Sequence, residues 1–157
     1  MKLLAAIILP MVMFSANPLL SVAGQTNGSN QEIASLVSQL SWDSVGGECN
    51  GIWRVFPDGE SAKKLVLIGK PATDELLMVL EDENRGVAAH LVLSEIWEPK
   101  RVAFGNRLEG DKFIHTYNGL EWVDILILKE KRIESTVEKG ALVRNAEEWR
   151  RKLARLR

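Results

Sequence analysis

A single break in an apolar segment constrains the fold of this chain more than any other feature. The stretch "LIGKPATDELLMVLEDEN", residues 67–84, interrupts its apolar residues at Gly69 and Pro71 and then resumes them. Glycine suits the C-terminal cap of a helix because it adopts a left-handed backbone at no steric cost. Proline suits the first turn of a helix, where its missing N–H is not needed. The break therefore predicts two short helices, 61–68 and 71–81, joined by a tight turn.

Three more helices are expected around this pair. Asn84 follows an acidic turn and is a candidate N-cap for a helix over 85–97, which ends before a proline. Asn30 is a candidate N-cap for an amphipathic helix over 30–42. The C-terminal helix carries an apolar seam at alternating spacings of four and three, formed by Leu142, Ala146, Trp149, Leu153 and Leu156. Helices joined by such short turns are expected to pack against one another.

Residues 65–96, "LVLIGKPATDELLMVLEDENRGVAAHLVLSEI", resemble a HEAT-type helical repeat. In that family a helix ending in Ile-Gly-Lys-Pro-Ala leads into a Leu-Leu-rich helix, an acidic turn and a Val-Ala-Ala helix. The chain departs from the family at Arg85-Gly86, where a valine-arginine pair is usual. The resemblance implies one helix hairpin and no particular function, because such repeats bind many unrelated partners. The matching positions are Ile68 to Ala72, Leu76, Leu77, Leu80, Asp82, Val87, Ala88, Ala89, Leu93 and Ile96.

A β-hairpin is expected between these helices and the C-terminal helix. "FIHTYNGLEWVDI", residues 113–125, alternates around Asn118-Gly119, and Asn-Gly is the strongest short signal for a two-residue hairpin turn. The competing interpretation makes residues 122–128 a buried helical turn. "IWRVF", residues 52–56, fits a strand or a helix equally well.

These elements together predict a mainly α fold. We expect one compact helical domain over residues 31–157, built around the HEAT-like helix hairpin, with a small β-hairpin before the C-terminal helix. One repeat cannot bury its own apolar face, so the flanking helices must cover it.

The first residues are typical of an export signal. Lys2 precedes an apolar segment over 3–14, and small residues follow at 21–24. We therefore expect a signal peptide over 1–24, a flexible leader over 25–30, and a periplasmic or secreted mature protein without a transmembrane span. The alternative is an uncleaved N-terminal anchor.

Composition argues against several functions and indicates no catalytic reaction. A net charge of −1 gives no general electrostatic basis for binding nucleic acid. Cys49 is the only cysteine, so it forms no internal disulfide and is expected to be buried, or else to pair between chains. Gly69-Lys70 is not a phosphate-binding loop, because Pro71 stands where that motif has serine or threonine. No catalytic residue, metal ligand or cofactor is assigned.

The candidate binding residues lie on the predicted β-hairpin: His115, Tyr117, Asn118 and Trp122. Exposed aromatic residues near a loop tip commonly bind partner proteins or sugars, whereas the alternative interpretation makes the tryptophans core anchors. His115 is also a candidate acid or base, and His90 is expected to be structural.

A second candidate surface is the basic face of the C-terminal helix, which is either a contact for an acidic partner or a solvated face. Its basic residues are Arg144, Arg150, Arg151, Lys152, Arg155 and Arg157. The sequence thus predicts an exported soluble helical module that binds an unidentified protein partner. The alternative is a small envelope enzyme or a glycan-binding protein that uses the hairpin face. The oligomeric state is left open.

Overall fold

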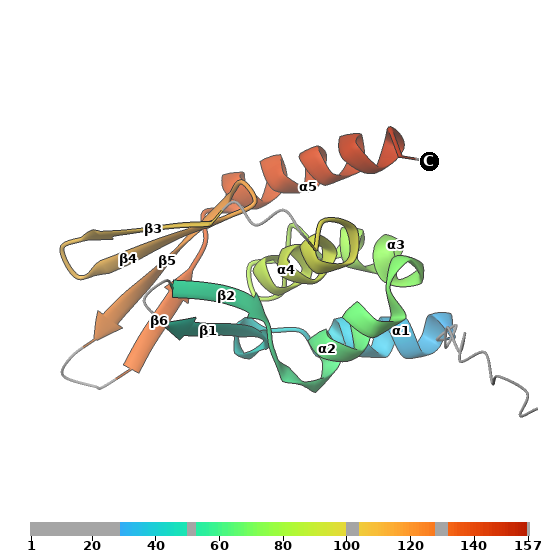
Figure 1. Ribbon diagram of the computed structural model, residues 1–157, viewed down its shortest axis with the longest axis horizontal. Helices are drawn as coiled ribbons and strands as arrows, with labels where there is room; N and C mark the ends of the chain where they lie inside the picture. Colours follow the sequence, from blue (N-terminus) through green and yellow to red (C-terminus); the bar gives the residue numbers. More distant parts are fainter. Residues whose placement is uncertain (1–28, 50–52, 100–103, 128–131, 157) are drawn as a thin grey trace, which may run out of the picture.

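The computed structural model describes residues 29–49, 53–99, 104–127 and 132–156, and within them the protein is a mixed α/β fold (Figure 1). The helices are α1 (Asn30–Ser38), α2 (Gly59–Ile68), α3 (Thr73–Met78), α4 (Gly86–Trp97) and α5 (Lys139–Ala154), with 3₁₀ segments η1 (Trp42–Ser44) and η2 (Lys70–Ala72). The strands are β1 (Val45–Cys49), β2 (Trp53–Pro57), β3 (Phe104–Glu109), β4 (Lys112–Tyr117), β5 (Leu120–Ile127) and β6 (Arg132–Thr136).

The prediction of a mainly α domain is wrong. Strands β3 to β6 form a four-stranded antiparallel sheet in chain order, and β1 pairs with β2 in a second, two-stranded sheet. Strands β1, β3 and β6 were missed because their sequences, VGGEC, FGNRLE and RIEST, mix glycine, polar and apolar residues. Such segments become strands by pairing with a neighbour, which their own residue pattern does not reveal.

The predicted break between helices is present in the structure. Gly69 ends α2 with a φ of 75°, and its N–H donates to the carbonyl of Leu65 at 3.0 Å. Pro71 lies in η2, so the regular helix α3 begins only at Thr73 and is shorter than the predicted 71–81. Asn84 does not cap α4: the N-cap residue is Arg85, which makes no side-chain capping hydrogen bond, and Asp82 Oδ1 accepts from the backbone N–H groups of Asn84 and Arg85 in the turn before the helix.

Gly86, at the start of α4, lies at a point of close packing. A Cβ at this position would lie 2.4 Å from the carbonyl oxygen of Leu80 and 2.9 Å from Cδ2 of Leu142 in α5. Glycine is therefore required by the close approach of the α3–α4 turn and of α5, although it is a poor helix former.

The predicted β-hairpin is confirmed as β4 and β5. Asn118 and Gly119 have φ values of 45° and 92°, as a two-residue type I′ turn requires. His115 pairs with Trp122 across the hairpin, and Tyr117 pairs with Leu120. The hairpin does not stand alone, because β3 and β6 extend it on both sides.

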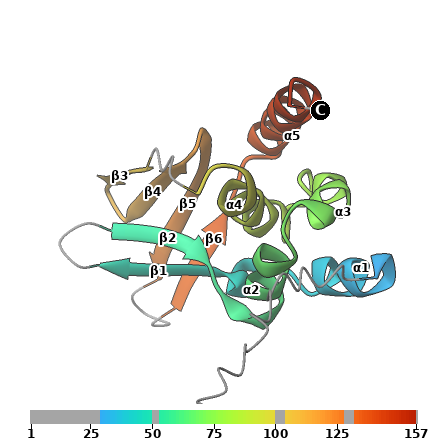
Figure 2. The same cartoon turned by 45° about the vertical axis from the view of Figure 1, so that its right-hand side comes forward.

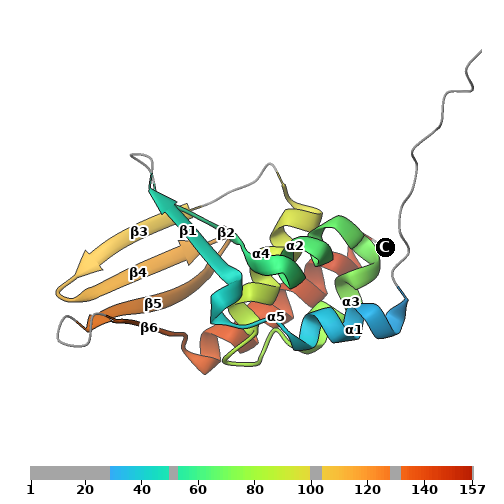
Figure 3. The ribbon, with the colours of Figure 1, turned by 90° about the horizontal axis from the view of Figure 1, so that it is seen from below.

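The buried residues form two clusters that meet at α4. One cluster joins α1 to α5 and contains the leucines of the helix hairpin, among them Leu65, Leu76 and Leu80. The other lies between α4, β2, α5 and the helix-side end of the large sheet, and contains Leu91, Tyr117, Leu120, Trp122 and Leu142. Figures 2 and 3 show α4 inside the helical layer and β1–β2 lying against the large sheet.

Candidate functional site

A cleft opens on the large sheet, on the face that carries Asn106, His115 and Asp124, called here the inner face. The cleft has a volume of about 470 Å³ and is lined by Asn106, Arg107, Leu108, Phe113, His115, Asp124 and Ile133. An adjoining cavity of about 270 Å³ shares His115, Asp124 and Ile133 with it and reaches Val45, Gly46, Gly47 and Val55 of the β1–β2 sheet. The cleft therefore begins where the β1–β2 sheet stops covering the larger sheet.

Strand register brings the polar groups of the cleft together. Asn106 pairs with His115 across β3 and β4, and His115 pairs with Trp122 across β4 and β5. Asp124 lies two residues beyond Trp122 and so projects from the same face. Residues that are distant in the sequence thus form one polar row across three strands.

His115 is held between the other two polar groups. Its Nδ1 is hydrogen-bonded to Asn106 Oδ1 at 2.7 Å, and its Nε2 lies 3.0 Å from Asp124 Oδ2 without the linear geometry of a hydrogen bond. The ring also stacks on Trp122, with centroids 5.4 Å apart. Both nitrogens are engaged and the residue is 4 % exposed. His115 therefore lies beneath the cleft with Nδ1 directed at Asn106 and Nε2 directed at Asp124.

Large apolar side chains surround this polar row and remain open to solvent. Leu108 is 62 % exposed, Phe113 43 % and Ile133 64 %. Leu108 pairs with Phe113 across β3 and β4, Phe113 pairs with Asp124 across β4 and β5, and Ile133 lines the same cleft, so the three apolar residues lie on the inner face. An exposed apolar group of this kind beside a few convergent polar atoms is typical of a binding site.

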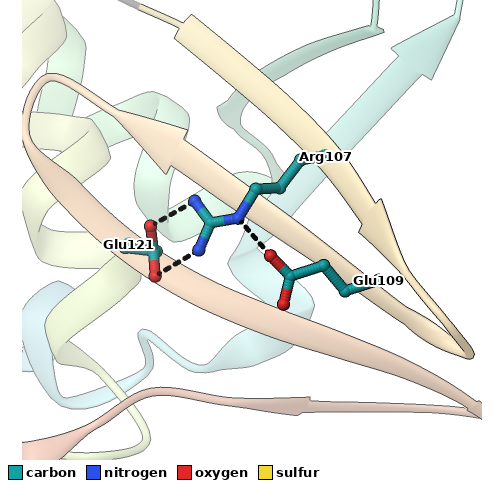
Figure 4. Close-up of polar contacts among 3 residues, drawn as sticks. All are labelled: Arg107, Glu109 and Glu121. Atoms are coloured by element: carbon teal, nitrogen blue, oxygen red, sulfur yellow. Dashed lines mark hydrogen bonds and ion pairs between the residues drawn. The ribbon is translucent and has the colours of Figure 1, made fainter.

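The opposite face of the sheet carries a cluster of paired charges beside apolar side chains, the buried Ile114 and the half-buried Val123, Ile125 and Ile127. Arg107 donates to Glu121 through both terminal nitrogens, at 2.9 and 3.3 Å, and to Glu109 through Nε at 2.9 Å (Figure 4). Arg107 pairs with Ile114 across β3 and β4. Because the Arg107 side chain extends across β4 to Glu121 on β5, it helps to cover Ile114, which is 6 % exposed. The guanidinium of Arg107 is thus already paired with two carboxylates on this face.

The structure separates the four binding residues predicted from the sequence. Tyr117 and Trp122 are each 2 % exposed, so the expected exposed aromatic pair does not exist. Tyr117 donates to Glu95 Oε1 at 3.3 Å, and burial raises the pKa of its hydroxyl. Asn118 forms the turn beside them. Only His115 contributes to the cleft, as a buried residue beneath it.

The sequence contains only a weak signal for the cleft residues that were not predicted. Asp124 is the single charged residue within "WVDILI", an apolar stretch of β5. A carboxylate inside an apolar strand is unusual and could have drawn attention to this position. Nothing local distinguishes Asn106, Leu108, Phe113 or Ile133, because their proximity depends on pairing among four strands.

The other histidine is part of the core, as the sequence predicted. His90 on α4 donates through Nε2 to the carbonyl of Tyr117 at 2.8 Å, and its Nδ1 accepts from Trp149 Nε1 at 2.9 Å. Complete burial lowers the pKa of His90 to about 4, against the opposing effect of the Tyr117 hydrogen bond. The neutral ring therefore joins α4 to the sheet and to α5.

Three of the basic residues of α5 form ion pairs within the protein. Arg150 contacts Glu81 at 2.9 Å, Lys152 contacts Glu98, and Arg144 lies 3.6 Å from Glu138. The Arg150 and Lys152 pairs join α5 to the segments that precede and follow α4, which favours the interpretation of a solvated face over that of a docking surface.

Comparisons with known proteins give no match: no protein-family model, no curated protein and no solved structure matches the chain. The resemblance to a HEAT-type repeat therefore stays a prediction. Within the described ranges, no helix is long and apolar enough to cross a membrane. The same ranges contain no group of three or more His, Cys, Asp or Glu side chains arranged to hold a metal ion.

Proposed function

We propose that the protein is an exported binding module whose cleft takes an apolar segment of a partner protein. Export is supported by the apolar segment 3–14 and the small residues 21–24, which lie outside the described residues. The observation that carries the binding proposal is the exposure of Leu108, Phe113 and Ile133 around one concave, mostly apolar site.

A partner segment suits this site better than an enclosed small molecule. The three apolar side chains stand at the rim, where 43 to 64 % of their surface reaches solvent. A drug-sized ligand is normally enclosed by its pocket, whereas a protein partner covers exposed rim side chains from outside.

The alternative functions of the hairpin, catalysis or glycan binding, have less support. Tyr117 and Trp122 are buried and so are closed to a sugar ring. A general base needs a nitrogen within reach of its substrate, and both nitrogens of His115 already contact protein groups.

The test compares two pairs of substitutions that remove exposed apolar side chains. The cleft pair is Leu108→Ser with Phe113→Ser. The control pair is Leu67→Ser with Met78→Ser, which lie on α2 and α3 and are 83 and 67 % exposed. The parent and both variants are immobilised and incubated with the envelope fraction of the source cell.

We expect the parent and the control pair to retain the same partner and the cleft pair to lose it, with melting temperatures close to that of the parent. Equal retention by both variants, or loss by the control pair alone, would show that the cleft is not the binding site.

A further inference from the structure

The position of Asp124 indicates what kind of group enters the cleft. Its Oδ2 contacts His115, but its Oδ1 is buried and has no hydrogen-bond partner among the described residues. A buried acceptor without a donor costs free energy, and such groups in native proteins need an explanation. The side chain of Asp124 as a whole is 24 % exposed and lines the cleft, so a donor that enters the cleft can approach the carboxylate and offset this cost.

The charges around Asp124 favour a cation as that donor. Among the described residues that line the cleft and its adjoining cavity, Asp124 is the one carboxylate. Arg107 also lines the cleft, but its guanidinium is held by Glu109 and Glu121 on the opposite face of the sheet. Within the described ranges, Asp124 thus contacts His115 and forms no ion pair with an arginine or a lysine.

The walls of the cleft require an apolar stem on the same ligand. Phe113 and Asp124 are directly opposite on β4 and β5, and Leu108 lies beyond Phe113 on β3. A group that reaches the carboxylate must therefore pass these apolar side chains. A lysine side chain has this form, since its methylene stem packs on apolar surface while its ammonium seeks a polar partner.

We infer that the partner inserts a cation on an apolar stem, a lysine side chain, with its ammonium on Asp124 and its methylenes against Leu108, Phe113 and Ile133. This inference rests on the proposed function and adds the chemistry of the recognised group. Asp124 is then the residue that determines specificity, and His115 and Asn106 position its carboxylate.

The test uses small probes instead of the unidentified partner. Hexylammonium and 1-hexanol have the same stem and differ in the charge of the head group. Each is titrated into the isotopically labelled parent protein, and dissociation constants are taken from the shifts of backbone amide resonances in β3, β4 and β5. The same titrations are made with Asp124→Asn, Phe113→Ser and the control Leu67→Ser, after their spectra have shown that the variants are folded.

We expect the parent to bind hexylammonium about tenfold more tightly than hexanol, as one additional charge-assisted hydrogen bond would give. Asp124→Asn should remove this preference while leaving hexanol binding unchanged. Phe113→Ser should weaken both probes, and Leu67→Ser should affect neither. In the parent alone, the preference should shrink as salt is added, because the contact is partly solvated.

The outcomes separate the two proposals. If hexanol binds as well as hexylammonium, and neither salt nor Asp124→Asn changes their ratio, the cation is refuted and the apolar cleft stands. If neither probe shifts the cleft resonances, the cleft does not accept apolar stems, and the inference fails together with the proposed use of the cleft.

Discussion

Acid should destabilise this protein through one buried histidine, His90. Its neutral ring donates to the carbonyl of Tyr117 and accepts from the indole N–H of Trp149. Protonation places a second N–H on the ring, directed at the indole donor. The change therefore breaks one buried hydrogen bond and leaves a charge in the core, both of which disfavour the folded state.

The size of the effect follows from the difference in the pKa of His90 between the two states. Burial lowers the pKa from 6.5 to about 4 in the folded protein. The unfolded chain therefore binds the proton more readily, so stability falls as the pH drops from about 6.5 to about 4. A shift of this size corresponds to about 3 kcal/mol, a large part of the stability of an ordinary domain.

The assay is urea unfolding of the parent and of His90→Gln at several values between about pH 7.5 and about pH 4.5. The variant is less stable at neutral pH, but the residue at position 90 no longer titrates. The chain contains two histidines, and the variant retains His115, so the difference between the two curves isolates His90. The pKa values of Asp58 and Asp82 are lowered by their ion pairs, so these residues act below this range and equally in both proteins.

We expect the stability advantage of the parent over the variant to shrink by about 2–3 kcal/mol across this range. A difference that stays constant within about 0.5 kcal/mol would refute the reasoning, because a buried neutral imidazole must show this linkage. A parent that becomes more stable on acidification relative to the variant would give the opposite sign and would place a carboxylate against the ring.

Two further predictions test the core and the N-terminus. Gly86→Ala should destabilise the protein by about 1–3 kcal/mol in urea unfolding, because the added methyl group meets the Leu80 carbonyl and Leu142, and overpacking has this cost. Gly140→Ala, also in a helix, meets only the flexible ends of side chains and should be neutral or stabilising; equal effects of the two would contradict the close approach. N-terminal sequencing of protein from the source cell should find a mature start near Gly24 or Gln25, and an intact Met1 would refute export.

Local chemistry explains which parts of the fold could be predicted from the sequence. Gly69 and Asn118-Gly119 were interpreted correctly, because each turn depends on backbone angles that only a few residue types adopt. The helix starting at Gly86 was also found, but its cap was assigned to Asn84, whereas the N-cap residue is Arg85 and no side chain caps the helix. Caps compete within one turn of chain, so spacing alone cannot select among neighbouring acceptors.

The missed features all depend on contacts between distant segments. Strands β3 and β6 become strands by pairing with β4 and β5, and the sheet turns a predicted helical domain into a mixed one. Tyr117 and Trp122 were expected to be exposed because they flank a hairpin turn, but α4 and the β1–β2 sheet cover that end. The cleft lies farther along the same strands, where sequence gives no sign that the cover ends.

The inner face shows why an open cleft at this place points to a partner. Near the hairpin turn, Tyr117, Leu120 and Trp122 are buried beneath α4 and its neighbours. Farther along, Phe113 and Leu108 remain large and apolar although they are 43 and 62 % exposed, whereas the apolar residues of the opposite face, Ile114, Val123, Ile125 and Ile127, are buried or half-buried. A sheet face that meets only water normally becomes polar. Covering these side chains would contribute a few kcal/mol of free energy. We therefore attribute their exposure to a binding function, in which another molecule covers them.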